Sequence, residues 1–221
     1  MTDPIVSRAT PLPADLVRRY LSWRETTYAQ NADRFRALAD KGQSPTAMVI
    51  SCCDSRIHVT SIFGADEGEF FIHRNVAALV PPFAPNGDYH GTSAAVEFAV
   101  TVLKVSKIIV LGHSKCGGVR GCYDMCSGAA PDLLSGSSFV GRWMNILSPA
   151  YARLPKADEE TRVRHLEKRA VLLSIENLMG FPFVAEAVEG GQMTLHGLWN
   201  DIGSGGLEAF DPEAGDFVPV Q

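Results

Sequence analysis

Three short runs of the chain are apolar at nearly every position, which is the pattern of strands buried on both faces of a sheet. They cover residues 47–51, 69–73 and 107–111. Between the last two, the apolar residues of Thr92–Leu103 recur three or four apart, which predicts a helix. Strands that alternate with helices favour a parallel arrangement. The predicted fold class is α/β, with a mainly parallel central sheet flanked by helices.

The same helical spacing begins earlier, between Pro13 and Lys41, and predicts one long helix or two in series, with Gly42 as the stop. The apolar stripe of this N-terminal helical arm is rich in aromatic residues, so it packs either on a partner subunit or on its own core. Further helices are expected at 117–126, 139–151 and 161–179, then a strand near 193–199 and a short final hairpin. We expect one domain over residues 1–221, with the arm at about 13–41 and the core at about 42–221.

Composition narrows the function classes. The chain has 221 residues, of which 46% are hydrophobic and 20% charged, enough for a full core in one domain. Its formal net charge is −5 without a run of Lys or Arg, which argues against nucleic acid and against an anionic membrane surface as partners. Neither a signal-peptide pattern nor a stretch of ~18 apolar residues occurs, so we expect a soluble, cytoplasmic protein.

Metal-binding residue types follow two of the predicted strands. Cys52 opens the segment Cys-Cys-Asp-Ser-Arg, and His113 opens His-Ser-Lys-Cys-Gly-Gly, which places Cys116 three residues later. In a parallel sheet both segments emerge at the carboxyl edge, where open α/β sheets bind ligands. Thiolate and imidazole are ligands that zinc prefers, and three protein ligands leave a fourth position for water. By itself this spacing is weak evidence, because the chain holds five Cys and six His.

Strand geometry indicates which of the two adjacent cysteines can be a metal ligand. Side chains alternate along an extended chain, so Cys52, Asp54 and Arg56 can share one side while Cys53 points to the other. Free cysteine is usually buried, and we therefore expect Cys53 to be a small core residue. Cys116 stands where a helix begins, and the positive end of a helix favours a thiolate.

The surrounding motifs resemble the β-carbonic anhydrase family in order and spacing. They are Gln43-x-Pro45, Cys52-x-Asp54-Ser55-Arg56, Arg74-Asn75-Val76, Gly91-Thr92, Gly112-His113-x-x-Cys116-Gly117-Gly118 and, near the end, Leu195-His196-Gly197. The resemblance implies a zinc lyase that holds one Zn²⁺ per chain on Cys52, His113 and Cys116. It also implies reversible hydration of carbon dioxide to bicarbonate and a proton by a zinc-bound hydroxide.

Family positions also suggest roles for neighbouring residues. Asp54 and Arg56 match a catalytic dyad, in which the carboxylate orients the nucleophile and the guanidinium keeps that carboxylate off the metal; elsewhere they would be a surface ion pair. The matches to substrate-binding positions, which could equally be loop or plain core residues, are Gln43, Phe71, Val76 and Phe98. Two residues depart from the family, because many relatives have tyrosine at Phe98 and asparagine is frequent at Ala78.

The resemblance further implies a homodimer or homotetramer, with Gln43 serving the neighbouring subunit's metal. Other readings of the same residues remain. A serine hydrolase elbow would need glycine at Cys116, and a P-loop would need the ending Gly-Lys-Ser/Thr after Gly117-Gly118. A zinc protein that only senses bicarbonate, and a relative that hydrolyses a sulfur analogue of carbon dioxide, stay open.

Overall fold

The computed structural model describes residues 9–87 and 90–221 of the chain. The chain divides into two compact units with a boundary between Gln43 and Ser44. The prediction of a single domain over the whole chain stays a prediction.

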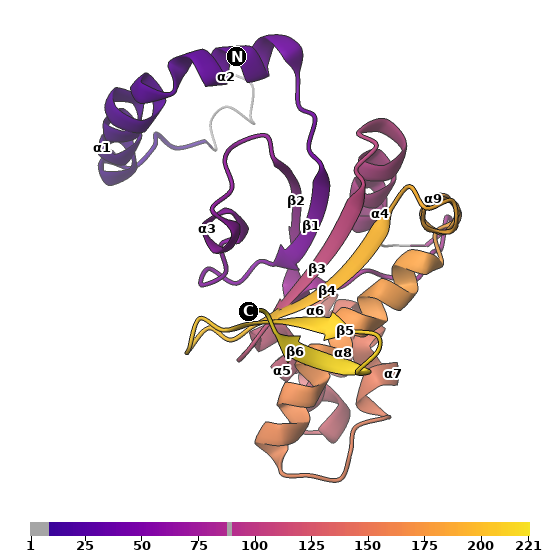
Figure 1. The fold of residues 1–221 in the computed structure, drawn as a ribbon. Coiled ribbons are helices and arrows are strands. Elements are labelled where there is room, and N and C mark those ends of the chain that lie inside the picture. Colours follow the sequence, from indigo (N-terminus) through magenta and orange to yellow (C-terminus); the bar gives the residue numbers. More distant parts are fainter. Residues whose placement is uncertain (1–8, 88–89) are drawn as a thin grey trace. The chain divides into compact units, whose positions relative to one another are not determined.

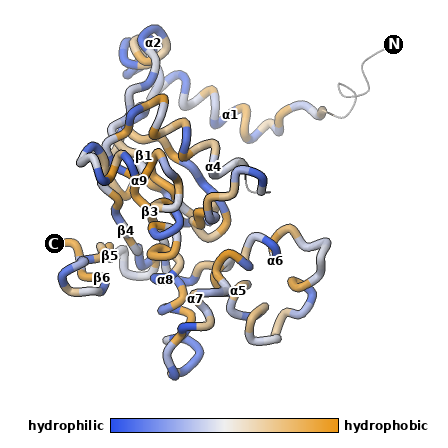
Figure 2. The backbone as a smooth tube through the Cα atoms, turned by 90° about the vertical axis from the view of Figure 1, so that its right-hand side faces the viewer, coloured by the Kyte–Doolittle hydropathy of each residue, from blue (hydrophilic) through white to orange (hydrophobic). Residues whose placement is uncertain are grey.

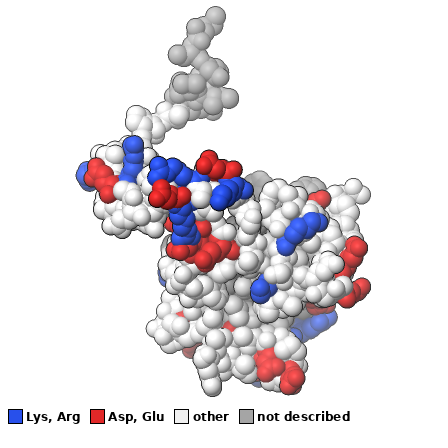
Figure 3. Space-filling model, turned by 45° about the horizontal axis from the view of Figure 1, so that its top comes forward, with Lys and Arg blue, Asp and Glu red and all other residues white. Residues whose placement is uncertain are grey.

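The first unit is helical. It contains α1 (Ala14–Trp23), a π-helical turn η2 (Arg24–Tyr28) and α2 (Ala32–Lys41), so the arm forms as two helices in series. Gly42 ends α2 with a φ of 78°. Aromatic rings join the segments, since the ring of Phe35 lies 5.1 Å from that of Tyr28. Basic and acidic side chains are interspersed along these helices (Figure 3).

The second unit is built on a six-stranded sheet in the order β2-β1-β3-β4-β5-β6 (Figure 1). Its strands are β1 (Ala47–Cys52), β2 (Phe70–Asn75), β3 (Lys107–His113), β4 (Thr194–Asn200), β5 (Leu207–Asp211) and β6 (Asp216–Pro219). The first four strands pair in parallel, whereas β5 and β6 add an antiparallel hairpin. The predicted α/β class, with a mainly parallel sheet and a final hairpin, is confirmed.

Helices of several lengths surround this sheet. They are α3 (Val59–Phe63), η3 (Val76–Ala78), α4 (His90–Glu97), η4 (Phe98–Val102), α5 (Gly117–Ser127), η5 (Pro131–Leu134), α6 (Phe139–Met144), η6 (Asn145–Leu147), α7 (Ser148–Tyr151), α8 (Glu159–Met179) and α9 (Pro182–Glu189). The helix expected over 139–151 is broken into three short segments, with Pro149 in the first turn of α7. No single described helix has the length and apolarity of a membrane span. Taken together, α8 and α9 are long and apolar enough, but the two helices are bent by 91° relative to each other.

The core lies on both faces of the central strands, which Figure 2 shows as predominantly hydrophobic. Met48 and Ile50 of β1 belong to a buried cluster that includes residues of α4, α8 and α9. Val49, between them, points to the opposite face and packs with Ile57 and Val59 near α3. β1 is therefore buried on both sides, as its apolar sequence indicates, and its last residue is held rigidly at the sheet edge.

The close approach of α8 to β3 depends on a glycine next to the edge. A Cβ atom on Gly112 would lie 2.6 Å from Cγ2 of Val171. We expect Gly112→Ala to lower the free energy of unfolding by about 1–3 kcal/mol, because α8 or β3 must shift to relieve this overlap. Urea denaturation of the two proteins measures the difference.

Gly117→Ala is the matched control, since a Cβ atom there meets no heavy atom within 4 Å. It should change the free energy of unfolding by no more than about 0.5 kcal/mol. Equal stability of both variants and the parent protein would contradict close packing of α8 against β3.

Candidate metal centre

Three buried side chains that can bind a metal meet at the carboxyl edge of the sheet. Cys52 is the last residue of β1, His113 is the last residue of β3, and Cys116 directly precedes α5. Parallel pairing of Ser51 with Leu111 brings the first two strand ends side by side. The ligand atoms all lie within 4.8 Å of one another, and the two sulfur atoms are 4.0 Å apart. The structure thus brings together the three residues predicted as ligands.

The imidazole of His113 is oriented by its neighbour. Its Nδ1 atom lies 2.9 Å from the carbonyl oxygen of Ser114, and a carbonyl only accepts, so Nδ1 carries the proton. The Nε2 atom is consequently an acceptor, and it is buried without a hydrogen-bond partner. A buried polar atom left alone is costly, and a metal ion would satisfy it. The donor set therefore fits a metal.

The two thiols influence each other's protonation. The pKa of Cys52 is lowered, chiefly by a hydrogen bond from the thiol of Cys116, and also by the backbone N–H groups of Asp54 and Ala77. Both N–H groups lie 3.4 Å from the Cys52 sulfur. The same thiol pair raises the pKa of Cys116, and burial adds to it. For His113, burial opposes the charged form, but the nearby Cys52 sulfur and the Ser114 carbonyl raise its pKa overall.

Asp54 and Arg56 form a bidentate ion pair just beyond β1. The Arg56 Nε atom donates to Oδ1 of Asp54 at 2.9 Å, and Nη2 donates to Oδ2 at 2.7 Å. The backbone N–H of Arg56 also donates to Oδ1, at 3.0 Å. These contacts, the guanidinium first, hold the pKa of Asp54 well below its usual range. The carboxylate is thus ionised at neutral pH and kept in one orientation.

Arg74 supports the same turn, although its sequence motif suggested no role for it. Its Nε atom donates to the Cys52 carbonyl oxygen at 2.9 Å, and Nη2 donates to that of Asp54 at 2.7 Å. A third bond reaches the carbonyl of Ile57 at 3.0 Å. The guanidinium of Arg74 therefore satisfies carbonyl groups at the end of β1 and in the turn that follows it.

Cys53 differs from its prediction. It is exposed rather than a buried core residue. β1 ends at Cys52, and the chain then leaves the sheet with the backbone N–H of Cys53 bonded to the carbonyl of Asn75 at 2.9 Å. Alternation along a strand correctly turns Cys53 away from the ligands, but beyond the strand end the opposite side is solvent.

The four residues predicted to bind substrate lie on different elements of the two units. Phe71 of β2 and Phe98 of η4 are in contact, with ring centroids 5.8 Å apart. Phe98 and Val76 are 41% and 39% exposed, so each is an open apolar position within one chain. Gln43 is exposed and is the last residue of the first unit. The roles of these residues stay predictions.

Two acidic residues from distant segments hold the loop that carries His113 and Cys116. Asp201 accepts a hydrogen bond from the Ser114 hydroxyl at 2.8 Å, and its pKa is lowered to about 2 by Ser204 and Ser114. Glu167 of α8 accepts the backbone N–H of Cys116 at 3.1 Å. Burial raises the pKa of Glu167, and the N–H of Cys116 opposes that shift. No local sequence signal marked either acid.

Fold and site together define an α/β protein with a Cys₂His cluster, able to hold a metal ion, at the carboxyl edge of its sheet. The family model described as carbonic anhydrase matches residues 47–207. A relative described as beta carbonic anhydrase 3 of Arabidopsis thaliana is 33% identical over 87% of this chain and 74% of its own length. The chain belongs to the β-carbonic anhydrase family, zinc lyases that catalyse carbon dioxide hydration.

Solved structures agree with this assignment. The β-carbonic anhydrase CcaA superposes with a TM-score of 0.81 at 27% identity, covering 94% of this chain and 91% of that one. A structure from a study of two tetrameric β-carbonic anhydrases of Sordaria macrospora has a TM-score of 0.70 at 30% identity, covering 92% of this chain and 96% of that one. The fold of the chain is thus the fold of the family.

Adjacent cysteines provide a direct test of the ligand set. We expect Cys52→Ser to lose most bound zinc, because it removes one of three buried ligands. Cys53→Ser is the control, and should keep about one zinc per chain because that side chain is exposed. Zinc content is measured by atomic emission on the purified proteins. Full zinc in Cys52→Ser would show that this residue is not a ligand.

Proposed function

We propose that this protein catalyses the zinc-dependent, reversible hydration of carbon dioxide to bicarbonate and a proton. The observation that carries the proposal is a three-ligand Cys₂His cluster beside a carboxylate held by a bidentate arginine. Membership of the β-carbonic anhydrase family supports it. Cys52, His113 and Cys116 would hold the zinc ion.

Bound zinc would lower the pKa of water to roughly 7 and so supply a hydroxide nucleophile at neutral pH. The protein's part begins with its ligands. The thiolates of Cys52 and Cys116 would balance the charge of Zn²⁺, and the proton of His113 on Nδ1 leaves Nε2 as the atom that would bind it. Three protein ligands leave one coordination position for chemistry.

Asp54 would orient the nucleophile. A carboxylate has about four lone-pair positions, and in this site three accept bonds from Arg56, two at Oδ1 and one at Oδ2. The remaining position on Oδ2 can accept the proton of the nucleophile, which points its lone pair at the substrate carbon. Because Arg56 fixes both oxygens, Asp54 is kept from binding the metal itself.

Apolar residues near β2 suit a small nonpolar substrate and a second subunit. The Phe71–Phe98 pair and Val76 would form the wall against which carbon dioxide is held. β2 is an edge strand, and Ile72, Val76 and Phe98 are each more than a third exposed. We propose that a second copy covers this surface in a homodimer or homotetramer, in which Gln43 serves as an amide donor to the substrate.

Stopped-flow measurement of carbon dioxide hydration tests the function. We expect zinc-dependent turnover that rises between about pH 6.5 and about pH 9, as a group of pKa roughly 7 loses its proton. Asp54 cannot cause this rise, because its pKa is held below the ordinary value and it is ionised throughout that range. Asp54→Asn should keep its zinc and lose about 10²–10⁴-fold in kcat.

Asp124→Asn is the matched control, because Asp124 also pairs with an arginine, accepting from Arg120 Nε at 2.8 Å, but on the surface of α5. Its turnover should equal that of the parent protein. A zinc-loaded parent without activity at any pH would contradict the proposal and favour a bicarbonate sensor or a sulfur analogue as substrate. Normal turnover in Asp54→Asn would remove the orienting role alone.

Oligomeric state is measured independently by light scattering on a sizing column. We expect a mass of two or four chains of 23.9 kDa. Phe98→Lys places a charge on the exposed apolar surface next to β2, and should shift the protein toward the single-chain mass. Phe139→Lys, at an exposed position of α6, is the control. A monomeric parent protein would contradict the shared-surface proposal.

A further inference from the structure

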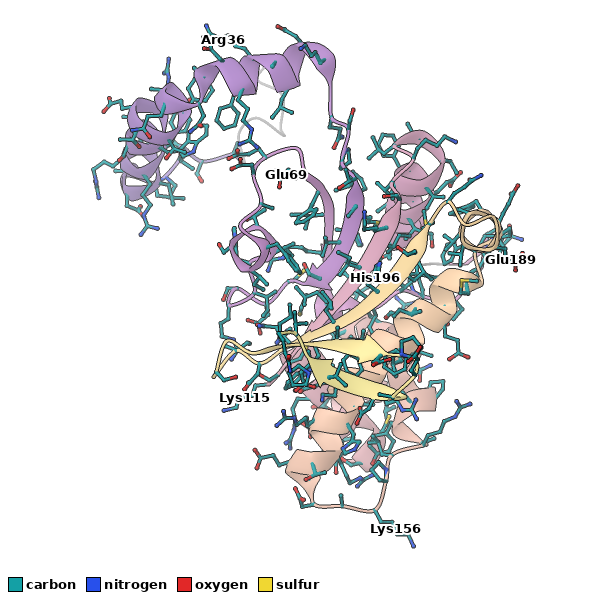
Figure 4. The ribbon with its side chains drawn as sticks, viewed as in Figure 1. Arg36, Glu69, Lys115, Lys156, Glu189 and His196 are labelled. Atoms are coloured by element: carbon teal, nitrogen blue, oxygen red, sulfur yellow. The ribbon has the colours of Figure 1, made fainter. Side chains whose placement is uncertain are left out.

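The loop between the second and third ligands has a strained backbone. Lys115 adopts a φ of 55°, in the left-handed region that residues with a Cβ atom avoid. Figure 4 labels Lys115 beyond the end of β3, and its side chain is exposed. This turn is what brings Cys116 back toward His113, so interactions elsewhere must hold it in place.

Four hydrogen bonds to distant segments hold the three successive residues Ser114, Lys115 and Cys116 of this loop. The hydroxyl of Ser114 donates to Asp201 at 2.8 Å and accepts the backbone N–H of Ile202 at 2.9 Å. The carbonyl of Lys115 accepts Nη2 of Arg56 at 3.0 Å. The backbone N–H of Cys116 donates to Oε1 of Glu167 at 3.1 Å. Only the last of these interactions holds a metal ligand directly.

Glu167 is an unusual residue for its position. It lies in the middle of α8, which packs on β3 and β4, and is only 4% exposed. Glutamate is almost never fully buried unless it is paired, because its charge loses hydration. Its carboxylate accepts the backbone N–H of Cys116 at 3.1 Å, and the backbone N–H of Lys115 and the indole of Trp199 also face it. An apolar residue would pack there at lower cost, so the fold alone does not account for a carboxylate.

We propose that Glu167 is a positioning residue for the metal, which holds the backbone of Cys116 so that its thiolate already faces His113 and Cys52. The inference rests on the zinc centre of the proposed function. Glu167 does not touch the metal or the substrate. It acts by keeping the left-handed turn at Lys115 closed, because a free Cys116 N–H would let that turn relax.

Zinc release to an excess of a chromogenic chelator tests this role without any turnover. Glu167→Ala removes the acceptor, and should release zinc between about 10-fold and about 100-fold faster than the parent protein. Glu167→Gln keeps a side-chain oxygen in the same place and should stay within about 3-fold of the parent, since it retains the hydrogen bond. Cobalt-substituted proteins report the geometry, and the thiolate-to-cobalt absorption should change only in Glu167→Ala.

A second substitution separates positioning from general stability. In the Glu167→Ala background, Lys115→Gly removes the backbone strain, because glycine adopts the left-handed region freely. It should return the zinc release rate most of the way to that of the parent. Glu160→Ala is the control, because Glu160 lies on the same helix and lines the same 640 Å³ cavity as Glu167, but is exposed. Its zinc release should be unchanged.

The outcomes are distinct. Faster release in Glu167→Ala with rescue by Lys115→Gly supports positioning. A lower melting temperature with unchanged zinc release, or fast release that Lys115→Gly does not slow, overturns it and leaves Glu167 with a structural role. If Glu167→Ala does not fold, the test rests on Glu167→Gln. Zinc release from that variant about 10-fold faster than from the parent also overturns the positioning role. A parent protein that binds no zinc contradicts the proposed function instead.

Discussion

Parallel pairing of β1 with β3 is the constraint on which the metal centre depends. The two strands lie far apart in sequence, yet their register aligns Ser51 with Leu111, so Cys52 and His113 leave the sheet at the same edge. Both strands are buried on both faces, which prevents a slip of register that would turn the ligands away. The third ligand then needs only a short turn. Long-range strand pairing thus positions Cys52 and His113, whereas the short turn after β3 positions Cys116.

Hydrogen-bond acceptors gather at this edge, and each is stabilised by donors of the protein itself. Cys52 accepts two backbone N–H groups, Asp54 accepts Arg56, and Glu167 accepts the N–H of Cys116. Because these acceptors are already oriented, a cation entering the site does not have to reorganise them. The same groups repel one another, which favours occupation by a doubly charged ion. The hydrogen bonds that orient the three ligand residues would therefore both keep the site rigid and favour the binding of a cation.

The strands, the ligand types and the Asp54–Arg56 pair could be predicted from the sequence, since each depends on a local pattern. The role of Glu167 could not be predicted, because an acidic residue in a long helix is expected on its solvated face, and only tertiary packing shows that it is buried. Cys53 was placed on the correct side of the strand but in the wrong environment, because burial beyond a strand end depends on neighbouring segments. The interrupted helix over 139–151 likewise reflects packing and Pro149 rather than periodicity.

Backbone strain connects these observations. Four non-glycine residues of the described chain have positive φ; Ala77 and Lys115 adjoin the ligands, and Ala78 follows Ala77. The backbone N–H of Ala77 donates to the Cys52 sulfur at 3.4 Å. Ala78 is 1% exposed with a φ of 55°, a backbone conformation that alanine rarely adopts. Asparagine tolerates the left-handed region better than alanine. Here the turn is held instead by Asn75, whose amide bonds both backbone groups of Leu79. The strain at this edge is thus maintained by side chains outside the ligand set, which is why the ligands alone do not define the centre.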